Sequence, residues 1–256
     1  MIPKRIIARL DVKGEFLVKG IQLEGIRKIG DPLQFAQTYY DAGVDEVVIV
    51  DVVASLYSRE HLYNLISYIT NKLRVPVTVI GGIKTLQEAN AVFRSGADKI
   101  GINSEATRNI DLLTKISEIY GAQAVVSSIE AKYDKEKSNW FLFTESGRNN
   151  SKISINEWFS KIEDIEIGEV FVTSVDSDGL KKGPDVSLMQ TARNLTPLPM
   201  IYSGGISSLL DAEEALKTGI DGLAIGSALH YKTIEISSLK KHLSDQGFSI
   251  RIEENK

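Results

Sequence analysis

The sequence predicts one eight-stranded α/β barrel spanning residues 1–256, and three observations indicate it. Eight short apolar runs alternate with eight helical patterns, and no Pro-, Gly- or Ser-rich linker interrupts them. The length of 256 residues suits a single barrel of this kind. A Gly-Gly-Ile turn occurs twice, at Gly81 and Gly204, and a serine follows 23 positions after each (Ser104 and Ser227). The repeat indicates a duplicated half-barrel, so the expected fold class is the (β/α)8, or TIM, barrel.

The eight predicted strands are nearly continuous apolar runs, as in strands buried on both faces of a parallel sheet. In chain order they cover Arg5–Asp11, Glu46–Asp51, Val77–Ile80, Lys99–Asn103, Ala124–Ile129, Glu169–Ser174, Met200–Ser203 and Gly222–Ile225. Helical patterns alternate with them over Pro32–Ala42, Glu60–Lys72, Leu86–Ser95, Ile110–Tyr120, Ile155–Ile165, Val186–Asn194, Leu209–Thr218 and Ile236–Ser244.

The connections between these elements are mostly short, with two exceptions. A long loop is predicted over Lys13–Gly30, before the helix that Asp31 caps and Pro32 begins. The polar segment Glu130–Ser154 is also long, and we expect it to carry a small β excursion around Trp140–Thr144.

Composition excludes several classes of protein. The net charge of −4 and the dispersed lysines and arginines argue against a nucleic-acid partner. The chain has no cysteine and only three isolated histidines (His61, His230 and His242), so we expect neither a disulfide nor a metal site, and no cofactor. No apolar run reaches membrane-spanning length and no signal-peptide pattern is present, so we expect no membrane partner and a cytoplasmic location.

The two Gly-Gly turns are typical of phosphate binding. Glycines directly after a strand let backbone N–H groups approach an anion, and the following helix N-terminus adds partial positive charge. We therefore expect one phosphate site in each half of the chain. The residues expected to bind substrate or phosphate are Gly81, Gly82, Asn103, Ser104, Thr173, Asp176, Ser203, Gly204, Gly205, Gly226 and Ser227.

Side chains at the carboxyl ends of barrel strands build the active site in this fold, which adds Asp51 and Thr78 to the candidates. Asp11 and Glu130 end strands on opposite sides of the barrel, an arrangement suited to general acid and base catalysis. Lys19 lies in the first long loop and is expected to close over a bound ligand. Arg9 shares the inward face of its strand with Asp11, so it needs an anionic partner, and we predict an ion pair with Glu130 or Asp51.

Six segments carry a family resemblance: Arg5-Ile6-Ile7-x-x-Leu10-Asp11-Val12-Lys13, Leu17-Val18-Lys19-Gly20, Gly30-Asp31-Pro32, Gly81-Gly82-Ile83, Ile102-Asn103-Ser104 and Thr173-Ser174-x-Asp176-x-Asp178-Gly179. In number and order they closely resemble the cyclase subunit of imidazole glycerol phosphate synthase, a (β/α)8 barrel of the histidine pathway. The resemblance covers essentially residues 3–245.

The resemblance implies a lyase that forms a heterodimer with a glutaminase subunit. That subunit supplies ammonia, which is used on a bisphosphate, phosphoribulosyl-formimino-aminoimidazole carboxamide ribotide. The implied products are imidazole glycerol phosphate and an aminoimidazole carboxamide ribotide. Asp11, Glu130 and Lys19 match the family's catalytic positions. Four residues match a charged gate through which ammonia enters the barrel bottom (Arg5, Glu46, Lys99 and Glu169), and Asp98 matches a position facing the glutaminase.

Three departures from the family pattern cluster near the reaction centre. Glu130 stands where the family has aspartate, Arg9 replaces a small or uncharged residue, and Ile80 replaces a third glycine of the first phosphate loop. They leave two alternatives open: an ammonia-channelling paralogue that serves amidination of an acetamido nucleotide sugar, and a non-catalytic activator of a glutaminase. The sister isomerase of the histidine pathway is disfavoured, because it needs no ammonia gate.

Overall fold

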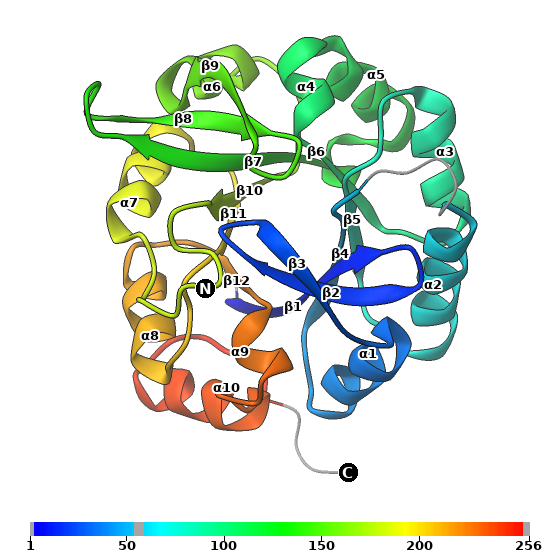
Figure 1. The fold of residues 1–256 in the computed structure, drawn as a ribbon, viewed down its shortest axis with the longest axis vertical. Helices are drawn as coiled ribbons and strands as arrows, with labels where there is room; N and C mark the ends of the chain where they lie inside the picture. Colours follow the sequence, from blue (N-terminus) through cyan, green and yellow to red (C-terminus); the bar gives the residue numbers. More distant parts are fainter. Residues whose placement is uncertain (1–2, 54–58, 253–256) are drawn as a thin grey trace.

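Eight parallel strands close into a barrel within the part of the chain that the structure, a computed structural model, describes, namely residues 3–53 and 59–252. The strands pair in the order β10-β11-β12-β1-β4-β5-β6-β7, and β7 pairs with β10 to close the ring. Helices surround this ring on the outside (Figure 1). The (β/α)8 prediction is confirmed.

The barrel strands are β1 (Arg5–Lys13), β4 (Glu46–Asp51), β5 (Val77–Ile80), β6 (Lys99–Ile102), β7 (Val125–Asp134), β10 (Glu169–Ser174), β11 (Met200–Ser203) and β12 (Gly222–Ile225). Antiparallel additions are β2 (Phe16–Ile21), β3 (Glu24–Gly30), β8 (Asn139–Thr144) and β9 (Asn149–Ser154). The helices are α1 (Pro32–Asp41), α2 (Arg59–Lys72), α3 (Leu86–Arg94), α4 (Ser104–Arg108), α5 (Asp111–Tyr120), α6 (Ile155–Ile162), α7 (Val186–Leu195), α8 (Leu209–Lys217), α9 (Ser227–His230) and α10 (Ile236–Asp245), with a 3₁₀ turn η2 (Ala122–Ala124).

The predicted loop Lys13–Gly30 is wrong, because this segment forms the hairpin β2–β3. Its turn residues Gln22 and Leu23 both have positive φ angles, 51° and 64°, in a position where glycine or asparagine is usual. The turn is held from outside, since the Gln22 N–H donates to the Asp178 carbonyl at 2.8 Å. The predicted β excursion is confirmed as β8 and extends through β9.

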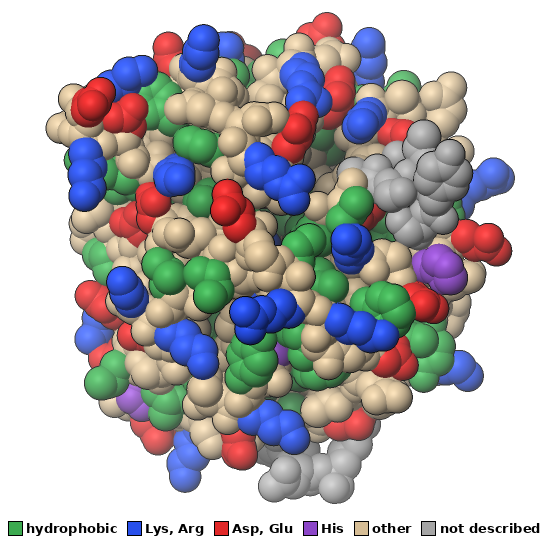
Figure 2. Space-filling view, viewed as in Figure 1, with side chains coloured by type: hydrophobic (Ala, Val, Ile, Leu, Met, Phe, Trp, Pro, Cys, Tyr) green, Lys and Arg blue, Asp and Glu red, His purple; other side chains and the backbone are tan. Residues whose placement is uncertain are grey.

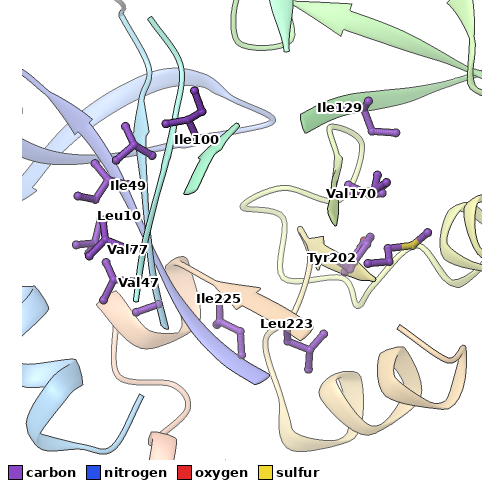
Figure 3. Packing of buried hydrophobic residues seen from close by; sticks show 14 of the residues in the cluster. Leu10, Val47, Ile49, Val77, Ile100, Ile129, Val170, Tyr202, Leu223 and Ile225 are labelled. Atoms are coloured by element: carbon purple, nitrogen blue, oxygen red, sulfur yellow. The ribbon is translucent and has the colours of Figure 1, made fainter. Parts of the chain in front are cut away.

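Two apolar layers lie on either side of the strand ring. The larger packs between strands and helices and includes Leu10, Ile49 and Val170, which Figure 3 shows on their strands. The smaller fills the barrel interior and includes Val48 and Phe171. In a closed ring alternate residues point inward, which sends Arg9 and Asp11 toward the mouth above this inner layer.

The two halves of the barrel repeat one backbone geometry. Gly81 and Gly204 have φ angles of 97° and 120°, and each lies against the backbone at the end of the preceding barrel strand, at Asp51 and Ser174 respectively. A Cβ on Gly81 would lie 2.5 Å from the Asp51 carbonyl oxygen, and one on Gly204 would lie 2.9 Å from that of Ser174. Both positions therefore need glycine, in agreement with the repeat.

The described residues contain no helix long and apolar enough to cross a membrane. On the face that the hairpin β2–β3 covers, Lys and Arg side chains are interspersed with Asp and Glu (Figure 2).

Gly205→Ala should destabilise the fold by about 3 kcal/mol, because its Cβ would lie 2.0 Å from the Gly183 carbonyl oxygen at a φ angle of 79°. Gly247→Ala is the matched control: its φ angle is 85°, and a Cβ there meets nothing within 4 Å. We expect a loss of only about 1 kcal/mol for the control. Urea unfolding of both variants measures the difference, and equal losses would contradict the steric explanation.

Candidate active site at the barrel mouth

A chain of buried charges crosses the barrel mouth. The Lys19 ammonium on β2 donates to Asp11 Oδ2 at 3.0 Å and to Asp178 Oδ1 at 2.9 Å. Lys19, Asp11 and Asp178 are all at most 5% exposed. Lys19 therefore joins the end of β1 to the segment after β10. Asp178 also belongs to this cluster, although it was not among the predicted site residues; its Asp-Gly context is typical of a turn.

Arg9 is buried, as predicted, but its ion-pair partner is Asp11 rather than Glu130 or Asp51. Its Nε donates to Asp11 Oδ1 at 2.7 Å, and its Nη1 donates to Ser203 Oγ at 3.0 Å and Thr173 Oγ1 at 3.4 Å. Strand periodicity gives the correct face but not the reach of the side chain. Asp11 lies two residues along the same face, and is therefore the nearest carboxylate.

The two candidate catalytic carboxyl groups differ in their pKa. Burial raises the pKa of Asp11, but the charges of Arg9 and Lys19 outweigh it and hold that pKa well below its usual range. Burial also raises the pKa of Glu130, here to about 7, against a hydrogen bond from Gly147 N–H and the charge of Arg9. Asp11 is thus ionised, while Glu130 is about half protonated at neutral pH and can supply the acid of an acid and base pair.

Glu130 is positioned by the turn between β8 and β9. Glu145, Ser146 and Gly147 have successive positive φ angles of 57°, 59° and 76°. This backbone points the Gly147 N–H at Glu130 Oε2, at 2.8 Å, while the Ser146 hydroxyl donates to the Val52 carbonyl at 3.0 Å. The sequence prediction placed β structure here but missed these contacts, because a turn seventeen positions after Glu130 has no local signal for them.

A small cavity of about 20 Å³ lies at the second Gly-Gly turn. Five predicted ligand-binding residues line it: Ser203, Gly204, Gly205, Gly226 and Ser227. Lys181, Gly179 and Asp178 also line it, and the sequence prediction missed Lys181. Backbone N–H groups and a lysine at one cavity are suited to a phosphate.

The residues before α4 and α9, one in each half of the barrel, have nearly the same backbone conformation. Asn103 precedes α4 with φ and ψ of −110° and −85°, and Gly226 precedes α9 with −108° and −85°. Ser104 Oγ accepts a hydrogen bond from the Glu145 N–H at 2.9 Å, so the β8–β9 turn lies against this loop. Gly82 also has a positive φ angle, of 71°. The Asn103 amide donates to the Phe143 carbonyl at 3.3 Å.

Two candidates lie elsewhere than expected. Thr78 is the second residue of β5, and its hydroxyl donates to Glu46 Oε1 at 2.6 Å at the bottom of the barrel, so its prediction as a mouth residue is wrong. Asp176 lies two residues after the end of β10, and its Oδ2 accepts from the Tyr133 N–H at 2.7 Å. Asp176 thereby ties the end of β7 to the segment that carries Asp178.

The four predicted gate residues form a ring of ion pairs at the amino ends of the strands. Arg5 bonds to Glu46 at 2.9 Å and also to Glu169. Lys99 bonds to Glu46 at 3.2 Å and Glu169 at 3.1 Å. Both glutamates are buried, whereas the two cations remain partly exposed. Each cation thus bridges both carboxylates, and the ring closes the barrel bottom.

Asp98 lies exposed at the same end of the barrel. Its Oδ2 accepts from the Val77 N–H at 2.8 Å. Asp45 and Asp221 do the same at two other strands, accepting from Ile6 and Met200 at 2.7 Å and 3.0 Å. Asp98 therefore helps to join β5 and β6, and its exposure leaves it accessible at the barrel bottom.

Glu130→Gln should stabilise the chain at pH 8 but not at pH 4. With a pKa near 7 when folded and 4.5 as its ordinary value, Glu130 weakens the fold as pH rises from about 4.5 through 7. Solvent in the cavity screens the charge of Glu130, which reduces the expected gain in the free energy of unfolding to about 2 kcal/mol. Urea unfolding at both pH values measures it, with the exposed Glu118→Gln as control. A gain independent of pH would contradict this titration.

Comparisons with known proteins indicate the family of the chain. Residues 5–235 match the family model described as "Histidine biosynthesis protein". The chain is 37% identical over 253 residues to the imidazole glycerol phosphate synthase subunit HisF of Thermotoga sp. (strain RQ2), covering 99% of both chains. The subunits of the same name from Petrotoga mobilis and Thermococcus onnurineus are 37% and 36% identical, over 98% of this chain and 100% and 99% of theirs. The chain belongs to the histidine biosynthesis protein family.

Proposed function

We propose that the chain is the cyclase subunit of imidazole glycerol phosphate synthase. It is a lyase-type enzyme that uses ammonia to convert phosphoribulosyl-formimino-aminoimidazole carboxamide ribotide to imidazole glycerol phosphate and aminoimidazole carboxamide ribotide. Its full-length similarity to subunits of that name supports the assignment. The observation that carries it is that Asp11 and Glu130 line one cavity at the barrel mouth, where their surroundings shift their pKa values in opposite directions.

Asp11 and Glu130 act as the base and the acid in this proposal. With a pKa raised to about 7, Glu130 carries a proton in about half of the molecules at neutral pH and can give it to an oxygen of the substrate. Asp11 is ionised and can take a proton, but both its oxygens are bonded to cations. Lys19 lies on the hairpin that covers the mouth, so movement of this hairpin would free Asp11 Oδ2 when substrate binds.

The two phosphates of the substrate occupy the two Gly-Gly loops. In the second half, Gly204, Gly205 and Ser227 line a cavity that Lys181 also reaches. In the first half, Gly81, Gly82, Asn103 and Ser104 repeat its backbone. Because the loops belong to opposite halves of the barrel, a ligand held at both ends places its middle near Asp11 and Glu130. Thr173 and Ser203 contribute to the same central region by accepting hydrogen bonds from Arg9.

A glutaminase subunit is the proposed source of ammonia, and Arg5, Glu46, Lys99 and Glu169 form its gate. The ring is closed, so ammonia passes only when an ion pair opens. Exposed Asp98 lies at the same end, where it can contact that subunit. The relatives reported above give no support to the nucleotide-sugar alternative. Glu130 in place of aspartate lengthens the acid by one methylene, which predicts a slower reaction than aspartate allows at this position.

The purified chain, given ammonium salt and the ribulosyl bisphosphate, should form imidazole glycerol phosphate. Asp11→Asn should lower this turnover by at least about 10²-fold, because a positioned base contributes that much or more. Chromatography of both products measures the rate, and circular dichroism checks the fold. The exposed Asp164→Asn is the control. No product from the unmodified chain would refute the proposed function.

Arg5→Ala should uncouple glutamine use from product formation. The variant leaves Lys99 alone between Glu46 and Glu169 and opens one side of the ring. Turnover with added ammonium should change little, because the mouth is intact, while ammonia lost to solvent per glutamine should rise. Lys4→Ala is the control, since Lys4 pairs with Asp221 outside the ring at 3.1 Å. An equal loss of turnover with glutamine and with added ammonium would indicate that the ring only stabilises the barrel.

A further inference from the structure

Arg9 has hydrogen-bonding capacity that its protein partners do not use. A guanidinium has five N–H donors. Its interactions with described residues use Nε, toward Asp11, and Nη1, toward Ser203 and Thr173, and leave Nη2 without a partner there. Arg9 also lines the central cavity at the mouth, together with Lys19 and Glu130. At 3% exposure, little of this side chain is open to bulk solvent, so its free donors face a confined space.

Packing does not explain an arginine at this position. Asp11 and Glu130 are counterparts in the two half-barrels, so Arg9, two residues before Asp11, corresponds to Ser128, two residues before Glu130. Ser128 is buried at 4% exposure, which shows that a small side chain can fill the equivalent place. Burying a guanidinium is costly unless charges compensate it. Without Arg9, Asp11 would still have a hydrogen-bonded cation, Lys19, at 3.0 Å.

The balance of charges in the site also allows a ligand atom to become negative. Arg9 and Lys19 are balanced by Asp11 and Asp178 when Glu130 is protonated. Negative charge that develops beside Nη2 would then lie next to a cation whose donors are already oriented by Asp11, Ser203 and Thr173. Donors fixed in advance in a site shielded from water are the arrangement that stabilises an oxyanion most effectively.

We propose that Arg9 is a catalytic residue, whose Nη2 binds the ketone oxygen of the ribulosyl group and stabilises the charge on it when ammonia adds. This inference rests on the proposed function. The ammonia lone pair forms the new N–C bond, and the C=O π pair moves to the oxygen. That oxygen takes the proton of Glu130, and the new ammonium group returns one proton to the Glu130 carboxylate. The product is a neutral carbinolamine, and no further reactant is needed.

The test compares Arg9→Ala and Arg9→Gln with the unmodified chain, using saturating ammonium and no glutaminase. Turnover (kcat) should fall by about 10²- to 10³-fold in both variants, as on loss of an oxyanion donor, while KM changes far less. Guanidinium ion, at concentrations that leave the protein folded, should restore part of the turnover of Arg9→Ala. It should not restore Glu130→Gln, whose missing group is an acid. Arg94→Ala, on the exposed end of α3, is the control for loss of a positive charge.

The outcomes separate the two proposals. Turnover by the unmodified chain supports the proposed function, and its absence overturns both that function and the role of Arg9. If the unmodified chain is active, near-normal turnover of folded Arg9→Ala overturns the role of Arg9 alone. So does a loss that appears wholly in KM, or one that guanidinium fails to restore in a folded variant. Loss in kcat with guanidinium rescue confirms it.

Discussion

The arrangement of the mouth depends on the buried carboxylate of Asp11. Arg9 lies 2.7 Å from one of its oxygens and Lys19 3.0 Å from the other. A buried charge is tolerated only with such partners, and each cation in turn needs its own compensation. Asp178 supplies it for Lys19 at 2.9 Å. One chain of charges therefore holds β1, the hairpin β2–β3 and the segment after β10 in a single geometry. The hairpin lies over the site because it carries Lys19, which bonds to Asp11 and Asp178.

A duplicated scaffold would be expected to give two similar carboxyl groups, yet Asp11 and Glu130 have opposite pKa shifts. Asp11 has two cations at hydrogen-bonding distance, whereas the hydrogen bonds to Glu130 come from neutral groups, the Gly147 N–H at 2.8 Å and the Asn103 side chain. The difference comes from single positions that break the pseudo-twofold symmetry, above all Arg9 opposite Ser128. An acid and a base thus arise from one repeated unit, because their surroundings and not their chemistry differ.

The parts of the fold that follow from local pattern were predictable. The apolar runs of β4, β5 and β10 were predicted to the residue, since strands buried on both faces have an uninterrupted signature. The hairpin was not, because its Gln22-Leu23 turn lacks glycine and is held by the distant Asp178 carbonyl. In the site, the strand period predicted that the Arg9 side chain points into the barrel, but it did not predict the ion-pair partner of Arg9. Distances across a closed barrel depend on ring geometry that no local segment contains.

The order of layers along the barrel axis bears on how ammonia would travel in the proposed reaction. Charged residues close the bottom, an apolar layer including Val48 and Phe171 follows, and Arg9 stands above it. An ammonium ion crossing the apolar layer would lose its hydration without gaining a partner, whereas neutral ammonia loses far less. Arg9 then repels any ammonium at the upper boundary of that layer. The order of these layers therefore favours the passage of neutral ammonia, which is the form that can attack a carbonyl carbon.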